Sequence, residues 1–179
     1  MKRLLPSVIV TALFFSVPVL ANAESDTGKS EMRINALTYH SEFDSAMTLV
    51  KRKDYDAAFV ELKKFARYGE KRAQYLTGVF YISGYGTEVN AGEGLAWIKL
   101  ALEQETTEWK QAYVEMTEKL TESQMKVIEN RYSQLIEMYG VKKQFMRCKV
   151  EKAKWSNIAE PTCKKELFQR AFYKVNQFE

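Results

Sequence analysis

The stretch from Ala73 to Ala101 constrains the fold of this chain more than any other part of its 179 residues. It reads A-Q-Y-L-T-G-V-F-Y-I-S-G-Y-G-T-E-V-N-A-G-E-G-L-A-W-I-K-L-A, with apolar residues at helical spacing on both sides of a turn at Gly84 and Gly86. Small residues recur where two helices would touch. The pattern is typical of one helix–turn–helix unit of a repeat array, an architecture that displays surface and needs no catalytic group.

The first half of the stretch resembles the first helix of the Sel-one-like repeats, which are relatives of the tetratricopeptide repeats. The family pattern A-Q-Y-x-L-G-x-x-Y is met at Ala73, Gln74, Tyr75, Gly78 and Tyr81. The family's G-x-G turn is met at Gly84 and Gly86, whereas Thr77 stands where leucine is usual. Ala73, Gly78, Tyr81, Gly84, Gly86 and, in the second half, Trp97 are therefore expected to serve the repeat structure.

The second half resembles the second helix of the same repeat through Leu95, Trp97 and Ala101. Asn90 replaces the usual opening Asp, and Gly94 replaces an Ala at a cost of about 1 kcal/mol in helix propensity. A partial copy begins at Asp54, and Asp54 and Asn90 are 36 residues apart (90 − 54), a period within the range of helical repeats. The clear resemblance covers residues 53–102, so flanking helices must cap the array.

Helical periodicity extends on both sides of the repeat. It predicts helices near 41–52, 54–68, 70–83, 91–104 and 108–118, and a capping box at Thr121 and Gln124 opens another that ends at Gly140. Further helices are expected over 144–155 and from Thr162 onward, and no alternating strand pattern of any length is evident. The sequence thus predicts an all-α superhelix, with a polar flexible leader at 24–40, a repeat domain at 41–140 and a helical extension at 141–179.

The first 23 residues have the features of a secretory signal peptide. Lys2 and Arg3 precede an apolar run from Leu4 to Leu20, and Ala21-Asn22-Ala23 forms a small-x-small cleavage site. No cysteine stands directly after that site, which disfavours a lipoprotein, and prolines within the run disfavour a membrane anchor. We expect cleavage after Ala23 and export to a bacterial periplasm.

Two cysteines, Cys148 and Cys163, fit an oxidising compartment, where a disulfide is the default. Two buried thiols or a metal site are the alternatives. A metal site lacks partners, because the sole histidine, His40, lies far away in sequence and no C-x-x-C is present.

The charge distribution is uneven. Residues 24–141 hold 15 Lys and Arg against 19 Asp and Glu, a net of −4, whereas residues 142–179 hold 10 against 4, a net of +6. The basic C-terminal segment either complements the acidic body of the same molecule or contacts an anionic partner such as phospholipid or acidic glycan. No nucleic-acid-binding motif is present.

The inventory of catalytic groups is small. His40 is the only histidine, and the chain lacks H-E-x-x-H, G-x-S-x-G and a phosphate-binding glycine loop. Carboxylate pairs such as Glu103 with Glu105 are the only candidates for a hydrolase, and they are also common on solvated helix faces. We expect no catalytic, cofactor-binding or metal-binding residues.

The repeat resemblance implies an adaptor module that binds a protein or peptide without a cofactor, and the signal peptide leads us to expect it in the periplasm. Lys71, Arg72 and Gln74 on the first repeat helix and Tyr85 in the turn are the candidate partner contacts. The alternatives are an envelope accessory protein whose basic segment touches lipid or glycan, and a cell-wall hydrolase.

Overall fold

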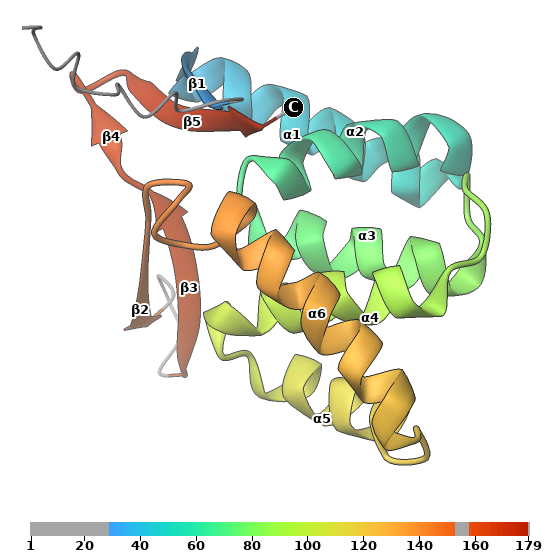
Figure 1. The fold of residues 1–179 in the computed structure, drawn as a ribbon. Helices are drawn as coiled ribbons and strands as arrows, with labels where there is room; N and C mark the ends of the chain where they lie inside the picture. Colours follow the sequence, from blue (N-terminus) through green and yellow to red (C-terminus); the bar gives the residue numbers. More distant parts are fainter. Residues whose placement is uncertain (1–28, 153–157, 179) are drawn as a thin grey trace, which may run out of the picture.

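The computed structural model describes residues 29–152 and 158–178, so the predicted signal peptide lies outside the described residues. Helices α1 (Ala36–Arg52), α2 (Tyr55–Arg67), α3 (Lys71–Ser83) and α4 (Ala91–Ala101) stack as two hairpins (Figure 1). A 3-10 turn, η1 (Leu102–Gln104), leads to α5 (Thr107–Thr117), and α6 (Glu122–Tyr139) crosses and packs on α4. These helices agree closely with the predicted ones, including the capping box at Thr121 and Gln124.

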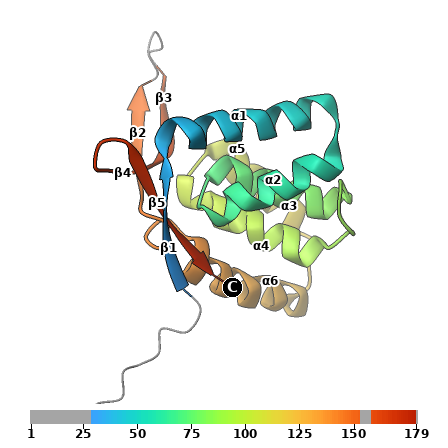
Figure 2. The same ribbon diagram turned by 90° about the horizontal axis from the view of Figure 1, so that it is seen from above.

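The all-α prediction is wrong, because both ends of the described chain form strands. Strands β1 (Lys29–Asn35), β5 (Phe172–Phe178) and the short β4 (Leu167–Phe168) make one antiparallel sheet in the order β1-β5-β4. Strands β2 (Met146–Lys152) and β3 (Ala159–Lys165) form a separate antiparallel hairpin. Seen from above, the strands lie along one side of the helical stack (Figure 2).

The two segments predicted as C-terminal helices are therefore strands. Leu167, Phe168, Phe172 and Val175 fit a helical spacing, but the chain instead buries the alternate residues Tyr173 and Val175 of β5. Tyr173 belongs to the main hydrophobic core. The described part of the predicted 141–179 extension thus contains strands, and its last strand, β5, packs against the hydrophobic core.

The predicted flexible leader is also replaced by structure over its described part. Residues 29–35 pair with β5 in a continuous antiparallel register from Lys29↔Phe178 to Asn35↔Phe172. The Asn35 side chain then accepts hydrogen bonds from the backbone N–H groups of Leu37 and Thr38 and caps α1, which begins at Ala36. The first helix consequently starts before the predicted residue 41.

Two side chains, those of Gln144 and Lys165, bind the backbone of β5 on the edge that does not pair with β1. The side-chain amide of Gln144 accepts a hydrogen bond from the backbone N–H of Asn176 (3.2 Å) and donates one to its backbone carbonyl oxygen (2.8 Å), as a neighbouring strand would. Lys165 is only 8% exposed, and its ammonium group donates to Gln144 O at 2.8 Å and to Lys174 O at 3.4 Å. These contacts attach the hairpin and sheet to each other.

The two helices of the predicted repeat unit, α3 and α4, make the most extensive contact between described elements. An added Cβ at Gly78 of α3 would lie 2.5 Å from Gly94 O and 2.5 Å from Ile98 Cγ1, both in α4. Gly94 in turn would place a Cβ 2.6 Å from Gly78 O. The glycine that replaces the family's usual alanine at residue 94 therefore permits the two helices to approach backbone to backbone. Thr77, at the usual leucine position, is fully buried with a hydroxyl that has no hydrogen-bond partner among the described residues.

We expect Gly78→Ala to destabilise the protein by about 1–3 kcal/mol, as overpacked cores do, although alanine favours helix formation. Gly92→Ala is the matched control, because a Cβ at this glycine of α4 would meet no atom closer than 3.8 Å. Urea denaturation of both variants measures the effect. Equal stability of the two variants would contradict the close helix crossing.

Candidate functional site: a basic, aromatic groove

A groove of about 670 Å³ lies between α2, the end of α6 and the β1–β5 sheet. Its volume falls in the range of roughly 300–1,000 Å³ that is usual for ligand clefts. Phe59, Lys63 and Arg67 recur at intervals of four along α2 and so share one face of that helix. The full lining is Ser30, Phe59, Val60, Lys63, Lys64, Arg67, Tyr68, Tyr139, Asn176, Gln177 and Phe178.

Aromatic rings from five elements pack beside and behind this groove. Phe59 of α2 meets Tyr81 of α3 edge to face, with ring centroids 5.1 Å apart. Tyr139 of α6 stacks on Trp97 of α4 at 5.6 Å and meets the Phe178 ring at 5.7 Å. Because these rings come from helices and a strand that are fixed in the core, the groove is largely preformed.

The charged side chains that line the groove are all cations. The Lys63 ammonium group lies 5.5 Å from the Phe59 ring centroid and 5.6 Å from that of Tyr81. Lys64 is already paired with Glu42 at 3.2 Å and Glu61 at 2.6 Å. Lys63 and Arg67 form no ion pair with any described carboxylate, so the groove has unneutralised positive charge.

The four predicted partner contacts do not form one surface. Lys71 and Gln74 are fully buried, so their prediction as surface contacts is wrong. Arg72, at the start of α3, is exposed. Tyr85 follows the other end of α3, is 40% exposed and stacks on Tyr55 with centroids 4.3 Å apart.

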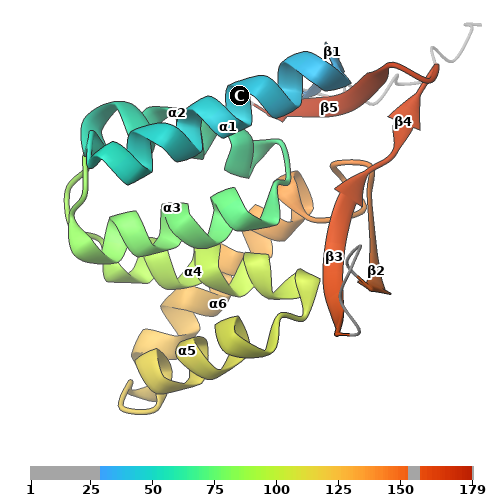
Figure 3. The same cartoon turned by 180° about the vertical axis from the view of Figure 1, so that it is seen from behind.

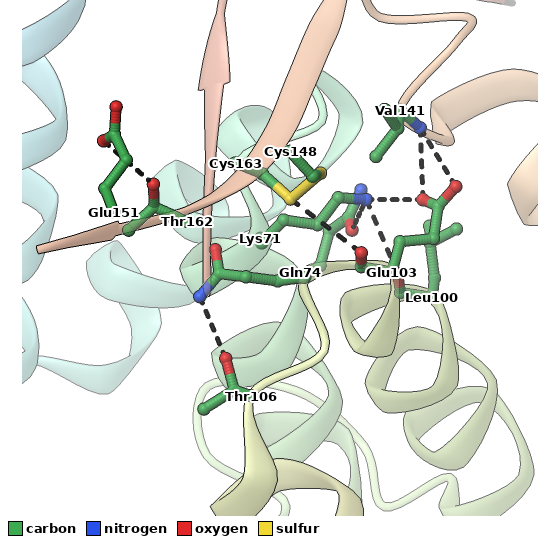
Figure 4. The surroundings of a disulfide bond; sticks show 11 residues. Lys71, Gln74, Leu100, Glu103, Thr106, Val141, Cys148, Glu151, Thr162 and Cys163 are labelled. Atoms are coloured by element: carbon green, nitrogen blue, oxygen red, sulfur yellow. Dashed lines mark hydrogen bonds and ion pairs between the residues drawn. A yellow bond between two sulfur atoms is a disulfide. The ribbon is translucent and has the colours of Figure 1, made fainter. Parts of the chain in front are cut away.

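Lys71 instead holds an internal polar cluster. Its ammonium group donates to Glu103 Oε2 at 2.7 Å and Gln74 Oε1 at 2.8 Å (Figure 4). The Glu103 carboxylate also accepts from the Val141 N–H at 3.1 Å. Burial lowers the pKa of Lys71, and the adjacent Glu103 charge opposes that shift. Gln74 donates to Ala66 O and Tyr139 O, so the cluster joins α2, α3, η1 and the end of α6.

The predicted disulfide is confirmed: Cys148 and Cys163 face each other across the β2–β3 hairpin. Cys163 Sγ also lies 4.0 Å from Glu103 O, which places the hairpin against η1 (Figures 3 and 4).

Reduction, or Cys148→Ser with Cys163→Ser, is expected to open this hairpin before the rest of the fold. The bridge spans a sequence separation of 15 residues. Closing a loop of this size contributes about 3 kcal/mol in the chain-entropy estimate. Amide exchange should rise first within 146–165, while α3, α4 and the β1–β5 ladder keep their protection. A simultaneous loss of protection throughout the protein would contradict a locally acting bridge.

Most described cations of the basic C-terminal segment are engaged within the molecule. Arg147 pairs with Glu166 at 2.8 Å, Lys174 pairs with Glu31 at 3.1 Å, and Lys149 and Lys164 both pair with Glu151. Hydrogen bonds from Lys149 and Lys164 lower the pKa of Glu151 to about 2. Lys165 is buried, whereas Lys142, Lys152 and Arg170 are exposed and form no ion pair with a described carboxylate, so contact of the segment with an anionic surface stays a prediction.

Burial lowers the pKa of Lys165 to about 7, from an ordinary value of 10.5. Between these values the unfolded chain binds more protons than the folded chain, so the free energy of unfolding should rise with pH, by at most about 1.4 kcal/mol per pH unit. Urea denaturation at pH 7 and pH 9 measures this rise. Lys165→Met should reduce the rise of the unfolding free energy with pH, whereas Lys164→Met, a change at an exposed lysine, should leave it as it is. An unchanged rise in Lys165→Met would contradict the assignment of this pH dependence to Lys165.

His40, the only histidine of the chain, does not stand in a catalytic triad in the described structure. Its Nε2 atom lies 3.0 Å from the Tyr173 hydroxyl in a partly buried contact that includes no carboxylate. The groove lining has no Asp or Glu. Within 29–152 and 158–178, no three His, Cys, Asp or Glu side chains gather at a metal-binding distance, and no helix is long and apolar enough to span a membrane.

One similar solved structure is that of a protective antigen present in uropathogenic Escherichia coli strains, which displays an SLR (Sel-one-like repeat) fold. The two chains are 25% identical, and the match covers 58% of this chain with a TM-score of 0.52. This chain spans only 23% of the antigen's length. No protein-family model and no curated protein matches the sequence. The likeness supports the repeat fold, whereas membership of the Sel-one-like family stays a prediction.

The groove was not predicted, although part of its signal is present in the sequence. Phe59, Lys63 and Arg67 form a visible helical stripe. The opposite wall comes from Gln177 and Phe178, in a segment predicted as helical, so the two walls could not be brought together from periodicity alone.

Proposed function

We propose that the protein is a non-catalytic interaction module of the bacterial envelope that holds an acidic, extended segment of a partner protein. The observation that carries the proposal is the groove between α2 and β5, in which aromatic walls surround Lys63 and Arg67, two cations that form no ion pair with a described carboxylate. The repeat fold shared with the antigen supports a role in displaying a binding surface. The signal-peptide pattern and the disulfide support export to the periplasm.

Charge and shape define the expected partner segment. Residues 24–141 have a net charge of −4, so the positive groove is a local exception on an acidic body and would orient an acidic peptide toward it. Val60, 66% exposed, and the neighbouring rings offer apolar contact. A segment with an apolar or aromatic side chain flanked by Asp or Glu matches both features.

Selection from a displayed peptide library, followed by calorimetric titration, tests this proposal. Selected peptides should be enriched in Asp and Glu, and Lys63→Glu with Arg67→Glu should weaken their binding at least about tenfold, or about 1.4 kcal/mol. Lys110→Glu is the control, because Lys110 is an exposed residue of α5 outside the groove. Peptides without acidic residues, or equal losses in both variants, would contradict the proposal.

A further inference from the structure

Strand β1 leaves one edge of its sheet open. The sheet order β1-β5-β4 gives β1 a single neighbour among the described strands. The opposite side of β5 is covered by β4, Gln144 and Lys165. The β1 register runs from residue 29 to residue 35 without a bulge, and the strand contains no proline. It therefore lacks two of the devices by which proteins protect exposed strand edges.

The hydrogen-bonding pattern between β1 and β5 determines which backbone groups of β1 point away from β5. Ala36 N donates to Ala171 O at 2.8 Å, which continues the β1–β5 register and marks that position as hydrogen-bonded. Antiparallel positions alternate, so Ile34 and Met32 bond to β5, whereas the N–H and C=O groups of Arg33 and Glu31 point away from it. Asn176 of β5 is the register partner of Glu31. Its backbone N–H and C=O groups bond to the Gln144 side chain, on the side of β5 that faces away from β1, as this alternation requires.

Glu31 and Arg33, whose backbone groups point away from β5, have opposite charges that can pair between two copies of β1. Two copies of β1, paired antiparallel about a two-fold axis at Met32, place Glu31 opposite Arg33 of the partner subunit and Arg33 opposite Glu31 of the partner subunit. Both are outward-pointing positions, so each pair can exchange two backbone hydrogen bonds. Shifting the register by two residues would instead bring two Glu31 side chains or two Arg33 side chains together, which is unfavourable.

The surroundings of these side chains also favour this register. Arg33 lies over the Phe168 ring at 4.7 Å and has no ion pair with any described carboxylate. It stands opposite Lys174 in the β1–β5 register, a like-charged neighbour. A carboxylate supplied by a second copy would provide the counter-charge that Arg33 lacks.

We propose that the open edge of β1 is the interface of a two-fold symmetric homodimer, in which the two sheets join through antiparallel β1–β1 pairing. The interface is isologous, since the same strand serves both copies. It uses no part of α2, and of the groove lining only Ser30 belongs to β1.

Sedimentation equilibrium of the mature chain and three variants tests the proposal. The wild type should dimerise, and Arg33→Glu or Glu31→Arg should each weaken dimerisation about tenfold or more, because both pairs become like-charged. The double variant E31R/R33E restores opposite charges in the same register and should restore the dimer. Because both single changes could disturb the sheet, the double variant keeps the test informative.

Amide exchange gives an independent readout. In the wild-type dimer, the N–H groups of Glu31 and Arg33 should gain protection with rising protein concentration, whereas Met32 should be protected at every concentration. A wild type that is monomeric at all concentrations, or a dimer that all three variants leave unchanged, would overturn the proposal.

Discussion

Truncating Trp97 to alanine should lower the free energy of unfolding by about 3–5 kcal/mol, as for other large-to-small core changes. The Trp97 side chain is 1% exposed in α4 and stacks on Tyr139 of α6. Its indole N–H donates to Glu93 Oε1 at 2.9 Å, and the same carboxylate accepts two hydrogen bonds from Arg131 of α6. The substitution therefore leaves a cavity and loosens the packing of α6 on the repeat.

Urea denaturation of Trp97→Ala and Trp97→Phe measures this effect. Phenylalanine keeps a ring against Tyr139 and loses only the hydrogen bond and part of the volume, so its loss should be clearly smaller. An unchanged melting temperature of Trp97→Ala would contradict a core role for this residue.

The second large effect is expected at Glu103. Lys71 is fully buried, and Glu103 is its carboxylate partner at 2.7 Å. Glu103→Ala would remove the carboxylate that forms the ion pair with this ammonium group and leave only the charge of Glu70 nearby, and removing one member of a buried pair costs about 3–5 kcal/mol. The Val141 N–H would lose its acceptor as well.

The Glu103 prediction has a matched control and a double variant. Glu115→Ala removes an exposed carboxylate of α5 and should change stability little. Lys71→Met combined with Glu103→Ala should recover much of the loss, because no unpaired buried charge remains. Equal stabilities of Glu103→Ala and Glu115→Ala would contradict the proposed pairing.

The sequence predicted the parts of this fold that depend on local contacts. Helices α3 and α4 are joined by a short turn, and their glycines, aromatics and apolar period all lie within residues 71–101. The capping box that opens α6 spans only Thr121 to Gln124. The disulfide was predicted from the compartment and the count of cysteines. In each case neighbouring residues, or a pair close in sequence, carry the information.

The missed features depend on partners that are distant in sequence. Strand β1 is polar and short, and it forms because β5, more than 130 residues later, supplies the ladder; the Lys174–Glu31 contact, for example, joins residues 143 apart. Lys71 was placed on the surface because lysine is rarely buried without a partner. That partner is Glu103, 32 residues further along the chain. The groove combines both difficulties, because one wall is a helix and the other is an unpredicted strand.

Site-specific photo-crosslinking tests the groove as a binding surface most directly. A crosslinking amino acid replaces Val60, an exposed groove residue, or Val114, a comparably exposed residue of α5 (66% and 61% exposed). With an acidic peptide from the library selection, we predict crosslinking from residue 60, none from residue 114, and loss of the residue-60 product when Lys63→Glu and Arg67→Glu are added. Equal crosslinking from both positions, or a residue-60 product that survives the charge reversal, would contradict the assignment of the groove.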